Sequence, residues 1–107
     1  DPLFDLAALA LFLRLDNATT STLIAAHDNE APAELSPYFG YARRLMAAAC
    51  AVMAFQVARR LGHAGGDATA APTLAEVYGA LGAGTLSLGS PQGMWAFALA
   101  FVRAIDA

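Results

Sequence analysis

The feature that most constrains this chain is one long helix-forming segment near its centre, from Pro37 to Leu61. Ser36 followed by proline is a typical helix start, because serine caps the first amides and proline suits the first turn. Two arginines, a leucine and then Gly62 form a typical helix end. At 1.5 Å per residue such a helix is about 37 Å long, whereas a compact domain of this size has a radius of gyration of about 13 Å. The helix is therefore expected to be central, and one of its ends has to project, bend or pack on a neighbour.

Other segments carry helical signals of their own. Thr73 and Glu76 fit a capping box, and Ser90 with Pro91 repeats the serine-proline start. No segment alternates convincingly in the manner of a strand. The sequence therefore predicts an all-α fold in one domain, a four- to five-helix bundle around the helix at about 37–61, with a flexible, glycine-rich loop at about 62–72. The remaining helices are expected at residues 1–15, 73–81 and 91–105, with a short fifth one over residues 23–26.

Composition supplies the main functional clue. The chain has 107 residues, of which 58 % are hydrophobic and only 14 % charged, and it is rich in alanine. The hydrophobic share exceeds that of ordinary globular domains, so intrinsic disorder is not expected. One small core cannot hide so many apolar side chains. Some of them are therefore expected to be covered by a partner subunit, an apolar ligand or lipid.

Several kinds of chemistry are disfavoured. The net charge is −3 and the six basic residues, all arginine, form no stripe, which argues against nucleic-acid binding. Without lysine there is no Walker-type phosphate loop. Cys50 stands alone within an apolar stretch, which favours a core residue over a nucleophile. We expect a non-catalytic protein without a cofactor.

A polar segment before the long helix offers a candidate metal or acid/base site, made of His27, Asp28, Asn29, Glu30 and Glu34. Imidazole and carboxylates bind divalent metals. However, the spacing does not place the ligands on one helical face. The interpretation we favour is a solvated loop, so no metal site is predicted.

The contact surfaces are predicted on two helices that show no clean polar stripe. The first helix is apolar nearly all round and is expected to be largely enclosed, and aromatic residues of the last helix are typical interface anchors. Leu9→Asp or Trp95→Ala should therefore weaken association. The candidate interface residues are Leu9, Phe12, Trp95, Phe97 and Phe101.

Two arginine pairs bracket the apolar centre of the long helix. Guanidinium groups bind carboxylates and other anions, so the pairs are candidates for contacts with an anion or a partner. A solvated or ion-paired helix end is the simpler interpretation, because the pairs do not share one helical face. The pairs are Arg43 with Arg44 and Arg59 with Arg60.

The hypothesis that accounts best for these features is a helical subunit or interaction module that buries its surplus apolar surface against copies of itself or another protein. One alternative is a membrane-associated helical protein, although the strictly apolar runs are shorter than the about 18–20 residues of a spanning helix. Another alternative is a bundle, with or without enzymatic activity, that binds an apolar ligand or a cofactor between alanine-rich helices. No motif in the chain identifies a family.

Overall fold

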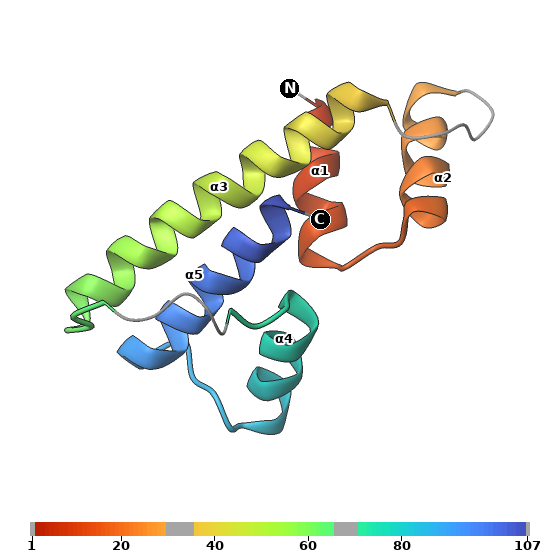
Figure 1. Cartoon of the computed structure of the whole chain (residues 1–107). Helices are drawn as coiled ribbons and strands as arrows, with labels where there is room; N and C mark the ends of the chain where they lie inside the picture. The colour runs from red at the N-terminus through yellow and green to blue at the C-terminus, as the bar shows by residue number, and fades with distance from the viewer. Residues whose placement is uncertain (1, 30–35, 66–70, 107) are drawn as a thin grey trace. The chain divides into compact units, whose positions relative to one another are not determined.

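The computed structural model describes residues 2–29, 36–65 and 71–106. These residues form five α-helices and no strand, so the all-α prediction is confirmed (Figure 1). The helices are α1 (Pro2–Phe12), α2 (Asn17–Asp28), α3 (Pro37–Arg60), α4 (Leu74–Ala83) and α5 (Pro91–Ile105). The longest is α3, with 24 residues.

The chain divides into two compact units, Asp1–Met46 and Ala47–Ala107. The division falls inside α3, so this helix contributes residues to both units, as a central helix must. The prediction of a small helical bundle built on a long central helix is therefore confirmed. The prediction of one domain over residues 1–107 stays a prediction.

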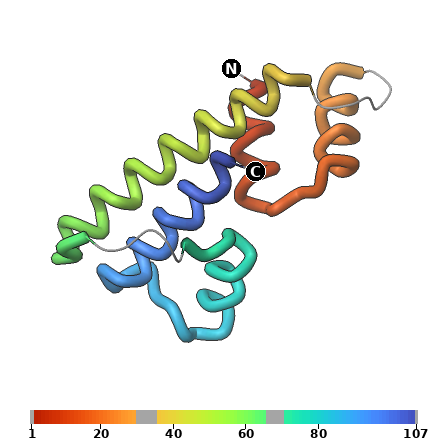
Figure 2. Tube along the Cα trace, viewed as in Figure 1, coloured from red at the N-terminus to blue at the C-terminus, as the bar shows by residue number. Residues whose placement is uncertain are grey.

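The first unit is built on a small core that α1 and the start of α3 share. Ala7 and Ala10 of α1 are buried with Phe39 and Ala42 of α3. Leu3, Phe4, Leu6, Leu15 and Ile24 pack against this cluster. Between α1 and α2 the chain reverses direction (Figure 2). The small alanines allow close approach of the helices, and Phe39 supplies most of the apolar volume at the centre.

The end of α1 and the start of α2 differ from the sequence prediction. α1 ends at Phe12, because Arg14 adopts a left-handed conformation with φ of 55°. The amide of Leu15 then donates to the carbonyl of Ala10 at 3.0 Å, which closes the helix end. Asp16 caps α2, and its carboxylate accepts a hydrogen bond from the amide of Thr19 at 2.7 Å. α2 therefore has 12 residues and is longer than the short helix expected at residues 23–26.

The second unit contains the rest of α3, α4 and α5. α5 runs beside α3 in the opposite direction (Figure 1), and the rings of Phe55 and Trp95 meet with centroids 4.6 Å apart. α4 packs on α5, where Tyr78 makes an edge-to-face contact with Phe97 at 6.1 Å. Val77 and Phe101 are the largest fully buried side chains of this unit.

Most predicted helix boundaries in this unit are confirmed. Ser90 caps α5 by accepting from the amide of Gly93 at 3.0 Å. Thr73 caps α4 by accepting from the amide of Glu76 at 3.1 Å. The capping box is only half formed, because the Glu76 carboxylate accepts from the Thr73 hydroxyl at 3.1 Å rather than from the Thr73 amide. Of the loop expected at 62–72, residues 66–70 lie outside the described residues.

Candidate interaction surface

The second-unit part of α3 presents its smallest side chains inward and larger apolar ones outward. Four alanines spaced four, three and four residues apart are buried, which places them on one helical face. They are Ala47, Ala51, Ala54 and Ala58. On the outside, Val52 is 56 % exposed and Met53 is 63 % exposed. The hydrophobic effect alone would favour the opposite arrangement in a chain that works as a single copy.

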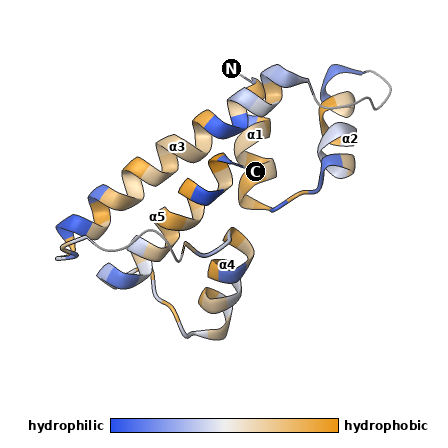
Figure 3. Cartoon of the chain, viewed as in Figure 1, coloured by the Kyte–Doolittle hydropathy of each residue, from blue (hydrophilic) through white to orange (hydrophobic). Residues whose placement is uncertain are grey.

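The first-unit part of α3 has large exposed side chains as well. Tyr38, Tyr41 and Leu45 are all exposed, and Tyr41 reaches 60 %. Phe39 and Ala42 face the core instead. Figure 3 shows the middle of α3 as mostly hydrophobic, with hydrophilic turns toward both ends of the helix. Neither Tyr38 and Tyr41 nor Val52 and Met53 were among the residues that the sequence singled out.

α1 is less enclosed than the sequence predicted. Ala7, Ala10 and Leu11 are buried. Leu9 and Phe12, both predicted contact residues, are 41 % and 42 % exposed, and Leu13 just beyond the helix is more exposed still. The expectation that α1 is largely enclosed is therefore wrong for the single chain. The accessibility of Leu9 and Phe12 is what a contact surface requires.

The predicted aromatic contacts on α5 are engaged inside the second unit. Trp95 is half-buried against Phe55 and His63. Phe97 packs edge-to-face on Phe101 at 4.7 Å. Phe101 is fully buried, so its side chain cannot reach a partner without unfolding of the core. We correct the prediction for Phe101, which is a core residue.

The two arginine pairs lie in different units. Arg43 is half-buried and Arg44 exposed in the first unit, while Arg59 and Arg60 are exposed in the second. Their role as anion or partner contacts stays a prediction. Sequence reasoning did not anticipate a role for Arg103, whose guanidinium Nη1 donates to the carbonyl of Ala71 at 2.8 Å. This bond ties the end of α5 to the segment before α4.

Of the candidate metal ligands, His27 and Asp28 lie in the last turn of α2 and Asn29 follows them. His27 Nδ1 and Asp28 Oδ1 are 2.9 Å apart, and both side chains are about half exposed. Glu30 and Glu34 lie outside the described residues. Among the residues that the structure describes, no three histidine, cysteine, aspartate or glutamate side chains gather in a way that would hold a metal.

Cys50 sits on α3 in a half-buried position. Burial raises the pKa of its thiol, because the charged thiolate is poorly solvated there. The thiolate is the nucleophilic form. The environment of Cys50 therefore suppresses the reactivity that a catalytic cysteine needs, in agreement with its interpretation as a packing residue.

Membrane insertion has its own structural requirement. Over the described ranges, the structure contains no helix that is both long enough and apolar enough to span a bilayer.

Comparisons with protein-family models, with curated proteins and with solved structures find no match to this chain.

Proposed function

We propose that this chain is a non-catalytic helical subunit whose exposed apolar side chains are covered by protein in an assembly. The observation that carries the proposal is the distribution of apolar side chains on α3. Small alanines occupy its buried face, whereas the larger Val52 and Met53 lie on the exposed side of the same helix. Exposed apolar clusters of this kind mark interaction sites more often than scattered single residues do. Leu9 and Phe12 on α1 add a second accessible apolar cluster.

Complete burial of a valine or methionine side chain stabilises a protein by about 1.5–3 kcal/mol. Because Val52 and Met53 are both more than half exposed, covering them contributes on the order of 2 kcal/mol to association. This contribution is a useful part of an interface, although a stable interface needs about 800 Å² per partner. The proposal therefore requires neighbouring exposed residues to take part.

The first experiment measures the mass of the purified chain without detergent, by light scattering on a sizing column and by native mass spectrometry. A discrete multiple of the 11.0 kDa chain supports an assembly of identical copies. A monomer without added mass contradicts self-association. A monomer that carries a few hundred daltons of extra mass supports the apolar-ligand alternative, and a requirement for detergent supports the membrane alternative.

A matched pair of variants identifies the surface. Met53→Asp places a charge on the proposed contact face and should abolish association. Gln92→Asp introduces the same charge at an exposed polar residue of another helix in the same unit, α5, away from the outer face of α3, so it should reduce association far less. Equal effects of the two variants would contradict the assignment of this face.

Oxidation of Met53 gives an independent readout. In the single chain its thioether is exposed and should react readily with dilute peroxide. In the assembly the same sulfur should be protected, while Met53 should stay reactive in a Val52→Asp variant that fails to associate. Unchanged oxidation in the assembled protein would exclude Met53 from the interface.

A further inference from the structure

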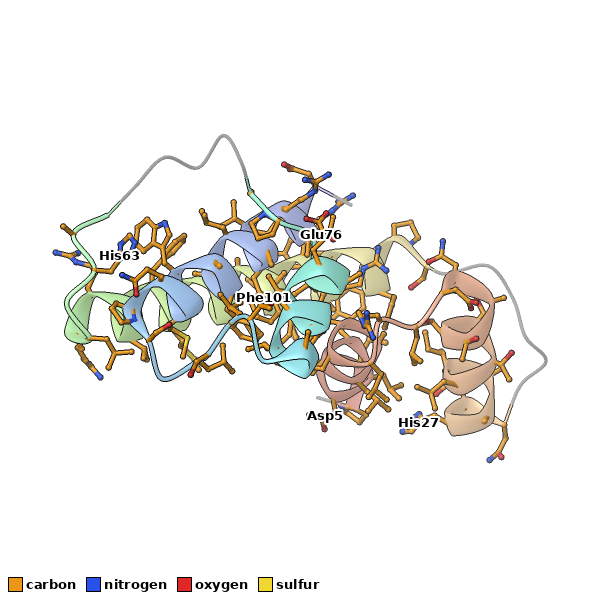
Figure 4. The ribbon with its side chains drawn as sticks, turned by 90° about the horizontal axis from the view of Figure 1, so that it is seen from below. Asp5, His27, His63, Glu76 and Phe101 are labelled. Carbon is orange, nitrogen blue, oxygen red and sulfur yellow. The ribbon has the colours of Figure 1, made fainter. Side chains whose placement is uncertain are left out.

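The end of α3 places a histidine against the only tryptophan in the chain. Gly62 takes φ of 104°, and the amide of His63 donates to the carbonyl of Ala58 at 3.0 Å. This left-handed helix end turns the chain sharply. As a result, His63 lies beside α3 and α5, where Figure 4 labels it.

The two rings are stacked. The centroids of His63 and Trp95 are 4.3 Å apart, and the ring planes differ by only 9°. Phe55 contacts the same indole with a centroid distance of 4.6 Å. The imidazole is therefore held from one side by an aromatic pair that joins α3 to α5.

A backbone hydrogen bond depends on the protonation state of this imidazole. The amide of Gly65 donates to His63 Nδ1 at 3.0 Å. Only an unprotonated Nδ1 accepts a hydrogen bond, so the contact requires the neutral ring with its proton on Nε2. Gly65 itself takes φ of 98°, a conformation that this bond helps to hold.

We propose that protonation of His63 switches off its hydrogen bond to the Gly65 amide, in the turn at residues 61–65 that ends α3. When the neutral ring gains a proton from water, Nδ1 becomes an N–H donor that faces the N–H of Gly65, and the hydrogen bond is lost. The imidazolium keeps its place on Trp95, because a cation is attracted to the face of an indole. Protonation thus frees Gly65 without opening the contact between α3 and α5.

Few charged side chains lie near His63 in the described parts of the neighbouring helices. On α3 the nearby charged side chains are Arg59 and Arg60 in the last turn. On α5 the residues from Pro91 to Val102 carry no ionisable side chain. Glu76 of α4 is labelled well away from His63 in Figure 4. In the described parts of these elements, no carboxylate neighbours the ring to form an ion pair that would replace the lost bond to Gly65.

The test is a nuclear magnetic resonance titration of the whole chain with acid, continued until the Cε1 proton of His63 shows that the ring has gained its proton. The Gly65 amide proton should shift upfield as its hydrogen bond is lost. This shift should follow the same midpoint as the Cε1 proton of His63. Fluorescence of Trp95 should fall over the same interval, because the charged ring stays stacked on the indole and quenches it.

Two variants complete the test. His63→Phe keeps an aromatic ring for Trp95 but has no acceptor and no proton to gain, so its Gly65 amide should already be released and should not titrate. His27→Gln removes the other histidine, which lies in the first unit, and should leave the Gly65 titration intact. A Gly65 amide that does not follow the His63 titration overturns the proposal, as does a titration that persists in His63→Phe. A rise in Trp95 fluorescence at low pH, in place of the expected fall, would overturn the claim that the stack survives.

Discussion

Gly93 lies so close to the carbonyl oxygen of Ser87 that a Cβ atom added to Gly93 would overlap it. The same turn is held by two hydrogen bonds: Ser90 Oγ donates to the Ser87 carbonyl at 2.8 Å, and the Gly93 amide donates to Ser90 Oγ at 3.0 Å. The connection between α4 and α5 therefore packs directly on the first turn of α5, at a point where only glycine fits.

Gly93→Ala should destabilise the chain by about 2–3 kcal/mol, because the obstructing atom is backbone and cannot rotate away. The free energy of unfolding, measured by urea denaturation, checks this. A loss below about 0.5 kcal/mol would mean that the turn relaxes without cost.

Gly79→Ala should have the opposite effect. Gly79 is exposed in the middle of α4, and nothing lies within 4 Å of an added Cβ. Alanine restricts the unfolded chain and favours helix, so the variant should be more stable by about 0.5–1 kcal/mol. Because it is the same substitution in the same unit, it is the natural control for Gly93→Ala in the same urea experiment.

Asp16 should make stability depend on pH in the acid range. Hydrogen bonds from the backbone amide and the side chain of Thr19 lower the pKa of its carboxyl in the folded state. A lowered folded-state pKa means that the contribution is present above the unfolded-state pKa and is lost as pH falls through the folded-state value. Asp16→Asn keeps a good capping residue without the titration. The difference in urea stability between the two proteins should therefore change as pH falls from about 6 to about 3, and a constant difference would contradict the role of Asp16.

The buried alanines of α3 should not tolerate larger side chains. Ala58 is fully buried, so Ala58→Leu should cost about 1–3 kcal/mol by overpacking. Ala49 lies on the exposed side of the same helix, and Ala49→Leu should change the stability of the monomer by less than about 0.5 kcal/mol. Thermal and urea unfolding of both variants at low protein concentration distinguish the two faces. Equal losses would mean that the alanine face has room to spare.

Helix boundaries in this chain could be predicted where the signal is local. Ser90 with its following proline, Thr73 and Gly62 act on the backbone within a few residues, and the structure places helix ends at each of them. Most of α2 could not be predicted, because the sequence around Asp16 resembles the end of the preceding helix. In the structure Asp16 is instead the N-cap of α2. The β-branched residues that follow favour helix weakly, and packing of Ile24 on the first-unit core stabilises it instead.

Which face of a helix is buried could not be predicted in the same way. On α3 the residues are apolar on nearly every side, so periodicity does not distinguish Ala54 from Met53. The choice depends on how closely the neighbouring helix approaches, which is a property of the assembled unit. For the same reason Phe101 was mistaken for a surface anchor, since an aromatic side chain suits a core and an interface equally well.

The alanine face of α3 also has a consequence for conformational entropy. Alanine has no rotamers to lose when it is buried, whereas methionine has many. The four alanines therefore contribute to the inner contact of the second unit without freezing any side-chain torsions of their own. The loss of side-chain entropy falls instead on Met53 and Val52, and it occurs only when a partner covers these exposed side chains.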